Sequence, residues 1–524
     1  MPAVISFRAL GCLTLLGLFA GQLPAADNVP PAGFTALFNG TDLAGWWGLK
    51  TVDPRKVWAM TAAELAEQKA AEQEDFAKHW TVQNGELVND GFGAYATTEK
   101  DYGDIELHVS FKTVPKADSG IYLRGTPQVQ IWDSTEEEKF KLGADKGSGG
   151  LWNNNPGNPG KDPLVLADRP FGEWNDFRIV QVGARTTVYL NDKLVVDHAI
   201  MDNFWDRKLP LFAKGPIQLQ THGGEIRWKN IYVREIGSEE ANRLLAARNK
   251  DGFVSLFDGK SLDGWAGAVE NYEVVDGNIR CKTGKGGVLH TRDEYDDFVA
   301  RLEFRLPPGG NNGLAIRYPG EGDTAYVGMC ELQILDTEHP KYSNLDPRQA
   351  HGSAYGMVPA ARGYLRPTGE WNFQEVTVKG STVKVELNGT VILDADLATV
   401  TEYLGDRPHP GKDRKSGYFG LAGHSDPVEF RNLQIKRLTD APYETPPAKP
   451  PVAAKPENSQ SAAPKTDAMP PKPATSAAPE VAVTPEASVP AAAPAVVCPP
   501  QSAPARRRLF QRRIQIIKST PCCQ

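Results

Sequence analysis

The chain has 524 residues, of which 23% are charged, and its formal net charge is −7. This length exceeds what one hydrophobic core ordinarily serves, so we expect two or three domains. The mildly acidic balance offers no basic surface for nucleic acid, and beyond the N-terminus no run reaches the roughly 20 apolar residues of a membrane-spanning helix. We therefore expect no nucleic-acid partner and no transmembrane segment.

The first residues have the pattern of an export signal. Arg8 precedes an apolar run over residues 10–20, which is too short to span a bilayer, and two alanines follow at 25–26. This pattern predicts a signal peptide over residues 1–26, cleaved after Ala26. The mature protein is then expected to be secreted or periplasmic.

The sequence that follows matches itself. Residues 37–40, Leu-Phe-Asn-Gly, recur at 256–259 as Leu-Phe-Asp-Gly, and Gly-Glu-Trp-Asn occurs at both 172–175 and 369–372. A period of about 200 residues is far longer than that of solenoid repeats, so it indicates a duplicated domain. The two units are predicted over residues 33–237 and 252–438.

Both units carry the alternation of β-strands. Residues 297–305 alternate apolar with polar side chains, and a second alternating run ends in an Asn-Gly turn at 388–389. Short strands and glycine-rich turns, with almost no helical period, predict an antiparallel β-sandwich in each unit. One exception is expected at 61–78, where Thr61 and Glu64 form a capping box before an inserted helix rich in Ala, Glu and Gln.

The composition changes after Leu438 to Pro, Ala, Lys, Glu and Ser, which cannot bury enough apolar surface to fold. We expect a disordered linker over residues 439–505 and a basic tail over 506–524. Contact of this tail with an anionic cell envelope is one interpretation, and an incidental charged end is the other.

Two cysteines, Cys281 and Cys330, fall in the part expected to fold. Both stand at core positions of apparent strands, so we expect two buried free thiols. Because export permits a disulfide, a bridge between them is the alternative.

The repeated motifs resemble those of the bacterial 3-keto-disaccharide hydrolase family, also described as 3-keto-glucoside 1,2-lyase and 3-keto-2-hydroxyglucal hydratase domains. The matching features are the Leu-Phe-Asn/Asp-Gly opening, the strands at 119–124 and 312–317, the two Gln-Ile-x-Asp strands, Gly-Glu-Trp-Asn, and the closing Arg431-Asn432. They cover nearly all of 33–437, twice. The resemblance implies an all-β chain of two tandem concanavalin A-like jelly-roll sandwiches. It also implies that the partner is a saccharide or 3-keto-glycoside substrate.

The stretch at residues 331–336 suggests where such a substrate would lie. Read as a strand, it puts Glu331 and Gln333 on one face and Leu332 and Ile334 on the other. The same alternation on neighbouring strands predicts a shared polar face, which in a curved jelly roll can be the concave face that holds saccharides. Its members would be Arg301, Glu303, Arg317, Glu331 and Gln333. The alternative is a solvated face with surface ion pairs worth less than about 1 kcal/mol each.

The second unit is the expected catalytic unit, because the first has Gln128 where the second has Glu331 and Ser110 where it has Glu303. The predicted catalytic residues are Glu331, His424, Arg317 and Glu303. The predicted substrate-binding residues are Gln333, Asp336, His351, Tyr355 and Arg301, together with Arg124, Gln130, Asp133 and His222 in the first unit.

The chemistry that the resemblance implies starts from a ketone at sugar C3, which makes the C2 proton acidic. The aglycone at C1 can then leave by elimination, and water can add to the resulting glycal. This needs a base at C2, a group that stabilises the enolate, and an acid at the leaving oxygen. The expected base is Glu331 or His424, the enolate stabiliser Arg317, and the acid Glu303, His351 or Tyr355.

Three alternatives stay open. No cofactor is certain, but a divalent metal ion held by Glu, Asp and His side chains would also polarise the ketone, although no tight motif such as His-Glu-x-x-His occurs. A non-catalytic, lectin-like protein would use the same sandwich. A conventional glycosidase would use Glu303 and Glu331 as its two carboxylates.

Overall fold

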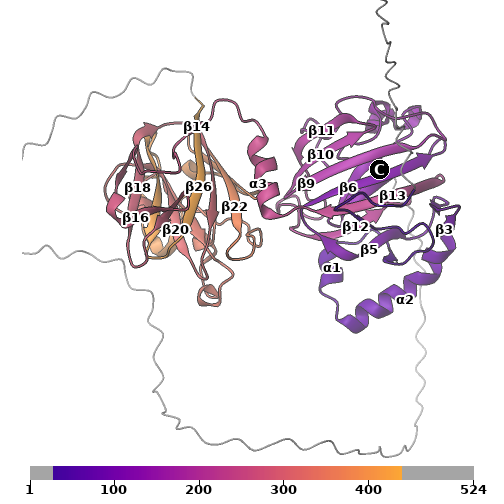
Figure 1. The fold of residues 1–524 in the computed structure, drawn as a ribbon, viewed down its shortest axis with the longest axis horizontal. Helices are drawn as coiled ribbons and strands as arrows, with labels where there is room; N and C mark the ends of the chain where they lie inside the picture. Colours follow the sequence, from indigo (N-terminus) through magenta and orange to yellow (C-terminus); the bar gives the residue numbers. More distant parts are fainter. Residues whose placement is uncertain (1–26, 439–524) are drawn as a thin grey trace, which may run out of the picture. The chain divides into compact units, whose positions relative to one another are not determined.

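The computed structural model describes residues 27–438 (Figure 1). The predicted signal peptide, linker and basic tail lie outside the described residues. The described chain forms two β-sandwiches in succession, and each pairs an eight-stranded sheet with a five-stranded sheet.

The first sandwich has antiparallel pairing throughout, and its two sheets draw on strands from the whole unit. The eight-stranded sheet contains β1 (Thr35–Ala36), β3 (Trp80–Gln83), β4 (Glu86–Asn89), β6 (Ile105–Thr113), β9 (Asn175–Val182), β10 (Arg185–Leu190), β11 (Lys193–Ile200) and β13 (Ile226–Glu235). The five-stranded sheet contains β2 (Trp46–Leu49), β5 (Tyr95–Tyr102), β7 (Ser119–Leu123), β8 (Thr126–Ile131) and β12 (Gly215–Leu219).

The second sandwich repeats this arrangement. Its eight-stranded sheet contains β14 (Val254–Ser255), β16 (Tyr272–Val275), β17 (Asn278–Cys281), β19 (Phe298–Arg305), β22 (Trp371–Lys379), β23 (Thr382–Leu387), β24 (Thr390–Asp396) and β26 (Glu429–Arg437). Its five-stranded sheet contains β15 (Trp265–Gly267), β18 (Gly286–Tyr295), β20 (Asn311–Tyr318), β21 (Cys330–Leu335) and β25 (Gly417–His424).

The strand order is the same in the two units. The large sheets run β11-β10-β9-β6-β13-β4-β3 and β24-β23-β22-β19-β26-β17-β16, and the small sheets run β2-β5-β12-β7-β8 and β15-β18-β25-β20-β21. The predicted all-β fold of two tandem sandwiches is therefore confirmed.

Alternating side chains fill the space between the two sheets of each sandwich. In the second, β21 contributes Cys330, Leu332 and Ile334, and β19 contributes four residues from Phe298 to Phe304. Full burial of one large apolar side chain stabilises a fold by about 1.5–3 kcal/mol, so this alternation fixes which way each strand faces.

The two cysteines of the described chain, Cys281 and Cys330, are buried and unpaired, as predicted, and the alternative disulfide is wrong. Burial raises the pKa of the Cys281 thiol to about 11 and also raises that of Cys330. Both thiols are therefore inert packing groups rather than nucleophiles.

Helices are few and short apart from one insertion. The α-helices are α1 (Pro54–Trp58), α2 (Ala62–His79), α3 (Ser238–Ala247) and α4 (Thr324–Val327), and the 3-10 turns are η1 (Glu137–Leu142), η2 (Ala144–Lys146), η3 (Val269–Asn271), η4 (Pro340–Tyr342), η5 (Pro347–Gln349), η6 (Leu397–Thr399) and η7 (Leu404–Asp406). No helix within residues 27–438 is long and apolar enough to cross a membrane.

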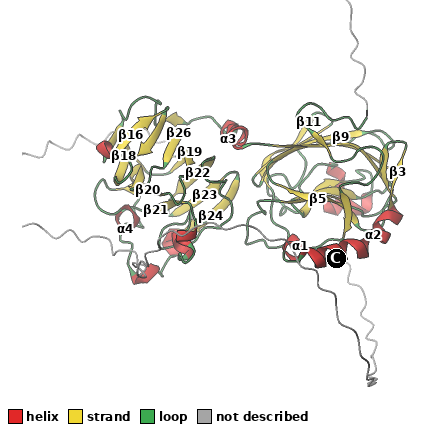
Figure 2. Cartoon of the chain, turned by 60° about the horizontal axis from the view of Figure 1, so that its bottom comes forward, coloured by secondary structure: helices red, strands yellow, loops and turns green. Residues whose placement is uncertain are grey.

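The insertion α1–α2 lies beside the five-stranded sheet of the first sandwich (Figure 2). Thr61 accepts a hydrogen bond from the Glu64 backbone N–H, and the Glu64 carboxylate accepts from the Thr61 N–H, so α2 begins at a complete capping box. Near its other end Phe76 is buried against β2, where a Cβ on Gly48 would come within 2.8 Å of the Phe76 Cβ. Glycine at this position allows the helix to pack directly on the sheet.

Helix α3 joins the two sandwiches. Its Ala241 and Leu245 pack with Val182, Ile236 and Phe373 in a small apolar cluster. The connection is therefore a packed element rather than a free linker.

Candidate functional site

The five-stranded sheet of the second sandwich carries an acid–base pair on its outer face, the face turned away from the core. Glu331 of β21 and His424 at the end of β25 approach to 3.2 Å between Oε1 and Nε2. Strand β20 lies between them, and its Gly313 has no side chain to block the way. A Cβ on Gly313 would clash with the Glu331 carboxylate, so this glycine lets Glu331 reach across to His424.

Small residues form the floor beside this pair. Ala315 of β20 stands opposite Gly420 of β25, and Ala422 follows two residues along on the same face. Aromatic rings stand further along, where His290 packs 4.5 Å from Tyr418. Small side chains thus lie next to the two titratable groups on this face.

The two side chains of the pair differ in exposure, and their contact changes the pKa of His424. The Glu331 side chain is 4% exposed and that of His424 is 33% exposed. Burial alone would lower the pKa of His424, but the hydrogen bond and negative charge of Glu331 outweigh it and raise that pKa above its ordinary value. The histidine therefore holds its proton to higher pH than a free imidazole.

Amide groups extend the site along β21. Gln333 donates its Nε2 hydrogen to Asn311 Oδ1 at 2.6 Å. This leaves the Asn311 amide hydrogens for a bound molecule. The sequence did not predict Asn311 as a site residue, because it is the first residue of its strand and the alternation pattern there does not show which face its side chain is on.

A rim of aromatic residues comes from the loops. The Tyr355 N–H donates to the Glu331 carbonyl at 2.9 Å, and Gln349 donates to the Tyr355 hydroxyl oxygen at 2.9 Å. Tyr326 of α4 lies edge-on to Tyr355 with ring centroids 6.5 Å apart, and the Arg407 guanidinium stacks 3.4 Å from the Tyr326 centroid. Tyr326 and Arg407 were also missed, since they lie far apart in sequence in segments without alternation.

The prediction that Arg301 and Glu303 share this face is wrong. Both lie on β19, which belongs to the eight-stranded sheet, whereas Glu331 belongs to the five-stranded sheet. Glu303 accepts hydrogen bonds from Asn242 of α3 and from the residue pair 431–432, and Arg301 donates to Glu375 at 2.6 Å. These charges hold α3 and neighbouring strands together, so Glu303 is neither the acid nor a second catalytic carboxylate next to Glu331.

The predicted enolate stabiliser Arg317 is likewise in the wrong place. Its φ of +47° takes the residue out of the strand alternation, and its guanidinium is 1% exposed. It donates to Asp297 at 2.9 Å and to three backbone carbonyls. Arg124 of the first unit repeats this arrangement, with a φ of +54° and a hydrogen bond to Asp104. Both arginines tie loops to the ends of inner strands, Arg124 at β7 and Arg317 at β20.

His351 and Asp336 lie near the end of β21 but face other groups. His351 is buried against Phe304 with ring centroids 5.1 Å apart, and burial lowers its pKa to about 3. It is therefore neutral and shielded, and the expectation that it supplies the acid is wrong. Asp336 accepts from the Gly309 N–H at 2.8 Å, which caps a turn.

Two predicted residues of the first unit, Gln130 and His222, join a polar chain through Asp118. Gln128 donates to Gln130, which donates to Asp118 Oδ1 at 2.9 Å, and His222 Nδ1 lies 3.1 Å from Asp118 Oδ2. Asp133 accepts from Lys116 and Thr135 in a loop. These groups satisfy one another.

The floor of this face is also filled in the first unit. Tyr122, Gln218 and Gln220 stand where the second has Ala315, Gly420 and Ala422, and all three are buried. Of the two described sandwiches, only the second thus combines small residues at these positions with a Glu–His pair.

Among the described residues, no group of three or more His, Cys, Asp or Glu side chains is placed to hold a metal ion. The Glu331–His424 pair supplies two such ligands at most.

Fold and site together define a tandem β-sandwich protein whose second unit carries a Glu–His pair on the outer face of its five-stranded sheet. The chain belongs to the family of 3-keto-alpha-glucoside-1,2-lyase-like domains, whose model matches residues 33–234 and again 252–436. The predicted family is therefore confirmed, and membership places the chain among carbohydrate-active proteins.

The chain is also similar to a named relative and to solved structures. A 3-keto-disaccharide hydrolase from Bacteroides thetaiotaomicron is 26% identical over 248 residues, which cover 40% of this chain and 86% of the relative. A solved structure from Parabacteroides distasonis, described provisionally as a glycosyl hydrolase, is 27% identical and covers 36% of this chain and 99% of its own, with a TM-score of 0.32. The carbohydrate-binding module CBM66 from Bacillus subtilis is 12% identical over 33% of this chain and 95% of its own, with a TM-score of 0.23.

Proposed function

We propose that the chain is an exported enzyme that cleaves 3-keto-glycosides at the outer face of the second sandwich. The observation that carries the proposal is the Glu331–His424 pair beside a floor of small residues, in a member of a 3-keto-glucoside lyase-like family. A relative named 3-keto-disaccharide hydrolase supports the same substrate class.

The first step is removal of the C2 proton by the Glu331 carboxylate. The C2–H electrons form the C1–C2 double bond as the C1–O bond breaks, and charge developing on the C3 oxygen is stabilised by donors. The proposed donors are the imidazolium of His424, which contacts the base, and the amide of Asn311, which is hydrogen-bonded to Gln333 on the strand of the base. This assignment replaces Arg317, whose guanidinium is bound elsewhere.

The leaving oxygen needs a proton, and Tyr355 can supply it. Because Gln349 donates to the Tyr355 oxygen, the hydroxyl hydrogen is left to be donated. Burial raises the pKa of Tyr355, so the phenol stays protonated until it donates its proton to the leaving oxygen. Addition of water across the C1–C2 double bond then gives the free 3-keto sugar, and the sum of the two steps is hydrolysis.

The decisive experiment compares a 3-keto-glucoside with its unoxidised parent, each incubated with the mature protein with and without chelator. We expect aglycone release from the keto sugar alone, whether or not chelator is present. Release from the parent would instead indicate a conventional glycosidase. Binding without turnover would indicate a lectin-like protein.

Glu331→Gln tests the base directly. It keeps the shape of the side chain but removes its basicity, so we expect turnover to fall by about 10²–10⁴-fold. Adding Gln128→Glu to this variant is the matched control, because Tyr122, Gln218 and Gln220 fill the first unit's floor and activity should not return. A wild-type rate in Glu331→Gln would refute the site.

A further inference from the structure

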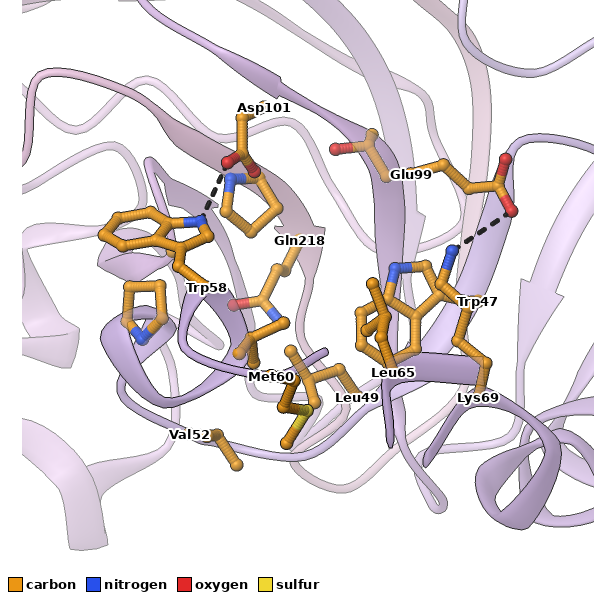
Figure 3. A pocket seen from close by; sticks show the side chains of 15 residues that line it. Trp47, Leu49, Val52, Trp58, Met60, Leu65, Lys69, Glu99, Asp101 and Gln218 are labelled. Atoms are coloured by element: carbon orange, nitrogen blue, oxygen red, sulfur yellow. Dashed lines mark hydrogen bonds and ion pairs between the residues drawn. The ribbon is translucent and has the colours of Figure 1, made fainter. Parts of the chain in front are cut away.

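The helical insertion of the first sandwich borders a pocket that the proposed reaction does not use (Figure 3). Its volume is about 300 Å³, and its lining comes from β2, β5, β12 and the segment 52–69. Gly125, in the turn between β7 and β8, also lines it, whereas Gln128 and Gln130 of β8 do not.

The second sandwich has no equivalent of this pocket wall. There the chain passes from β15 to β16 through residues 268–271, whereas the first unit inserts residues 50–79, with α1 and α2, between β2 and β3. The insertion therefore gives the first unit a feature that duplication alone does not explain.

Two tryptophans give the pocket apolar walls. Trp47 is 6% exposed and lies beneath the Lys69 ammonium, 5.2 Å from its ring centroid, while Trp58 is 43% exposed. The Trp58 ring is held in place, because it packs edge-on against Phe212 at 5.2 Å and donates its Nε1 hydrogen to Asp101 at 2.8 Å. A fixed indole that remains open to solvent is a ready platform for a ligand with a flat apolar face.

Polar groups converge on the same space. Asp101 accepts the Trp58 hydrogen through Oδ2. The Gln218 side-chain amide donates to Thr97 Oγ1 at 2.9 Å, so the Gln218 side-chain oxygen is left as an acceptor. Glu99 lies 3.4 Å from Lys69, so that pair is internally neutralised. The lining thus combines aromatic walls with acceptors, and its net charge of −1 comes from the Asp101 carboxylate, because Lys69 and Glu99 offset each other.

We propose that this pocket binds a neutral pyranose ring of an unoxidised saccharide, so that the first sandwich is a sugar-binding module. A pyranose ring has an apolar C–H face that matches an indole and an edge of hydroxyl donors that matches Asp101 and Gln218. A volume of about 300 Å³ is at the lower end for ligand pockets, which favours one ring over a longer segment.

The test measures binding of maltose and cellobiose to the full mature chain carrying Glu331→Gln, by calorimetry and tryptophan fluorescence. Use of that variant and of unoxidised sugars separates this binding from turnover in the second sandwich. We expect Trp58→Ala to weaken binding at least tenfold. Asp101→Asn, which preserves the shape of the pocket, should weaken it severalfold.

The control is Trp152→Ala, since Trp152 is also an exposed tryptophan of the first unit but does not line the pocket. It should bind both sugars as the parent does. Absence of sugar binding, or equal binding by the Trp58→Ala and parent proteins, would overturn the proposal and leave the proposed reaction untouched. Binding of glucosamine but not of neutral sugars would overturn it as well, because the ligand class would then be cationic.

Discussion

The pair of Glu331 and His424 works through a difference in protonation. Because Glu331 raises the pKa of His424, the imidazolium persists to higher pH and is ready to stabilise an oxyanion. Glu331 thus holds His424 in the state that its proposed role requires.

This coupling predicts a pH dependence at the scale of single residues. If the imidazolium is the required form, kcat/KM should fall as the pH rises through the raised pKa of His424. In Glu331→Gln burial would be opposed only by the charges of Asp323 and Asp426, so the His424 titration midpoint measured by NMR should move down.

His222 provides the internal control for that titration. Asp118 raises its pKa in the same way in the first unit, and Glu331→Gln should leave its midpoint unchanged. An unshifted His424 midpoint would contradict the coupling.

At the scale of the element, the repeat and the strand alternation predicted the sandwiches and the outward position of Glu331 correctly. They could not assign β19 to its sheet. Alternation tells which residues of a strand turn away from the core, but a sandwich has two outward faces, and Glu303 and Glu331 turn to different ones. No strand alternation applies to Arg317 with its positive φ, to Tyr326 in the one-turn helix α4, or to Arg407 in a loop.

The role of strand β20 can be tested by Gly313→Ala. The added methyl group would clash with the Glu331 carboxylate and push it away from His424, so we expect turnover to fall at least tenfold while the fold persists. Gly237→Ala is the control, since a Cβ there meets nothing within 4 Å. Full activity in Gly313→Ala would show that the crossing of Glu331 over β20 is not needed.

At the scale of the whole described chain, the two sandwiches share a buried ionic contact. Arg185 of the first donates through Nε to Glu386 of the second at 3.0 Å, and Arg248, just after α3, donates to the same carboxylate at 3.0 Å. The Glu386 side chain is only 2% exposed, so its charge and those of the two arginines must neutralise one another within the protein.

Glu386→Gln should therefore lower the free energy of unfolding by about 3 kcal/mol at neutral pH, because two arginines lose their counter-charge. Burial alone would raise the pKa of Glu386, but the hydrogen bond from Arg185 and the two arginine charges hold it below the ordinary 4.5. A depressed pKa stabilises the fold above the unfolded value and ceases to do so as the pH falls through the folded one. The difference in unfolding free energy between variant and wild type, measured with denaturant, should thus shrink below about pH 4.5.

The control is Glu429→Gln, at the more exposed pair with Arg305. It should change the free energy of unfolding by less than about 1 kcal/mol. A difference for Glu386→Gln that stayed constant down to pH 3 would mean that the contact does not depend on the carboxylate charge.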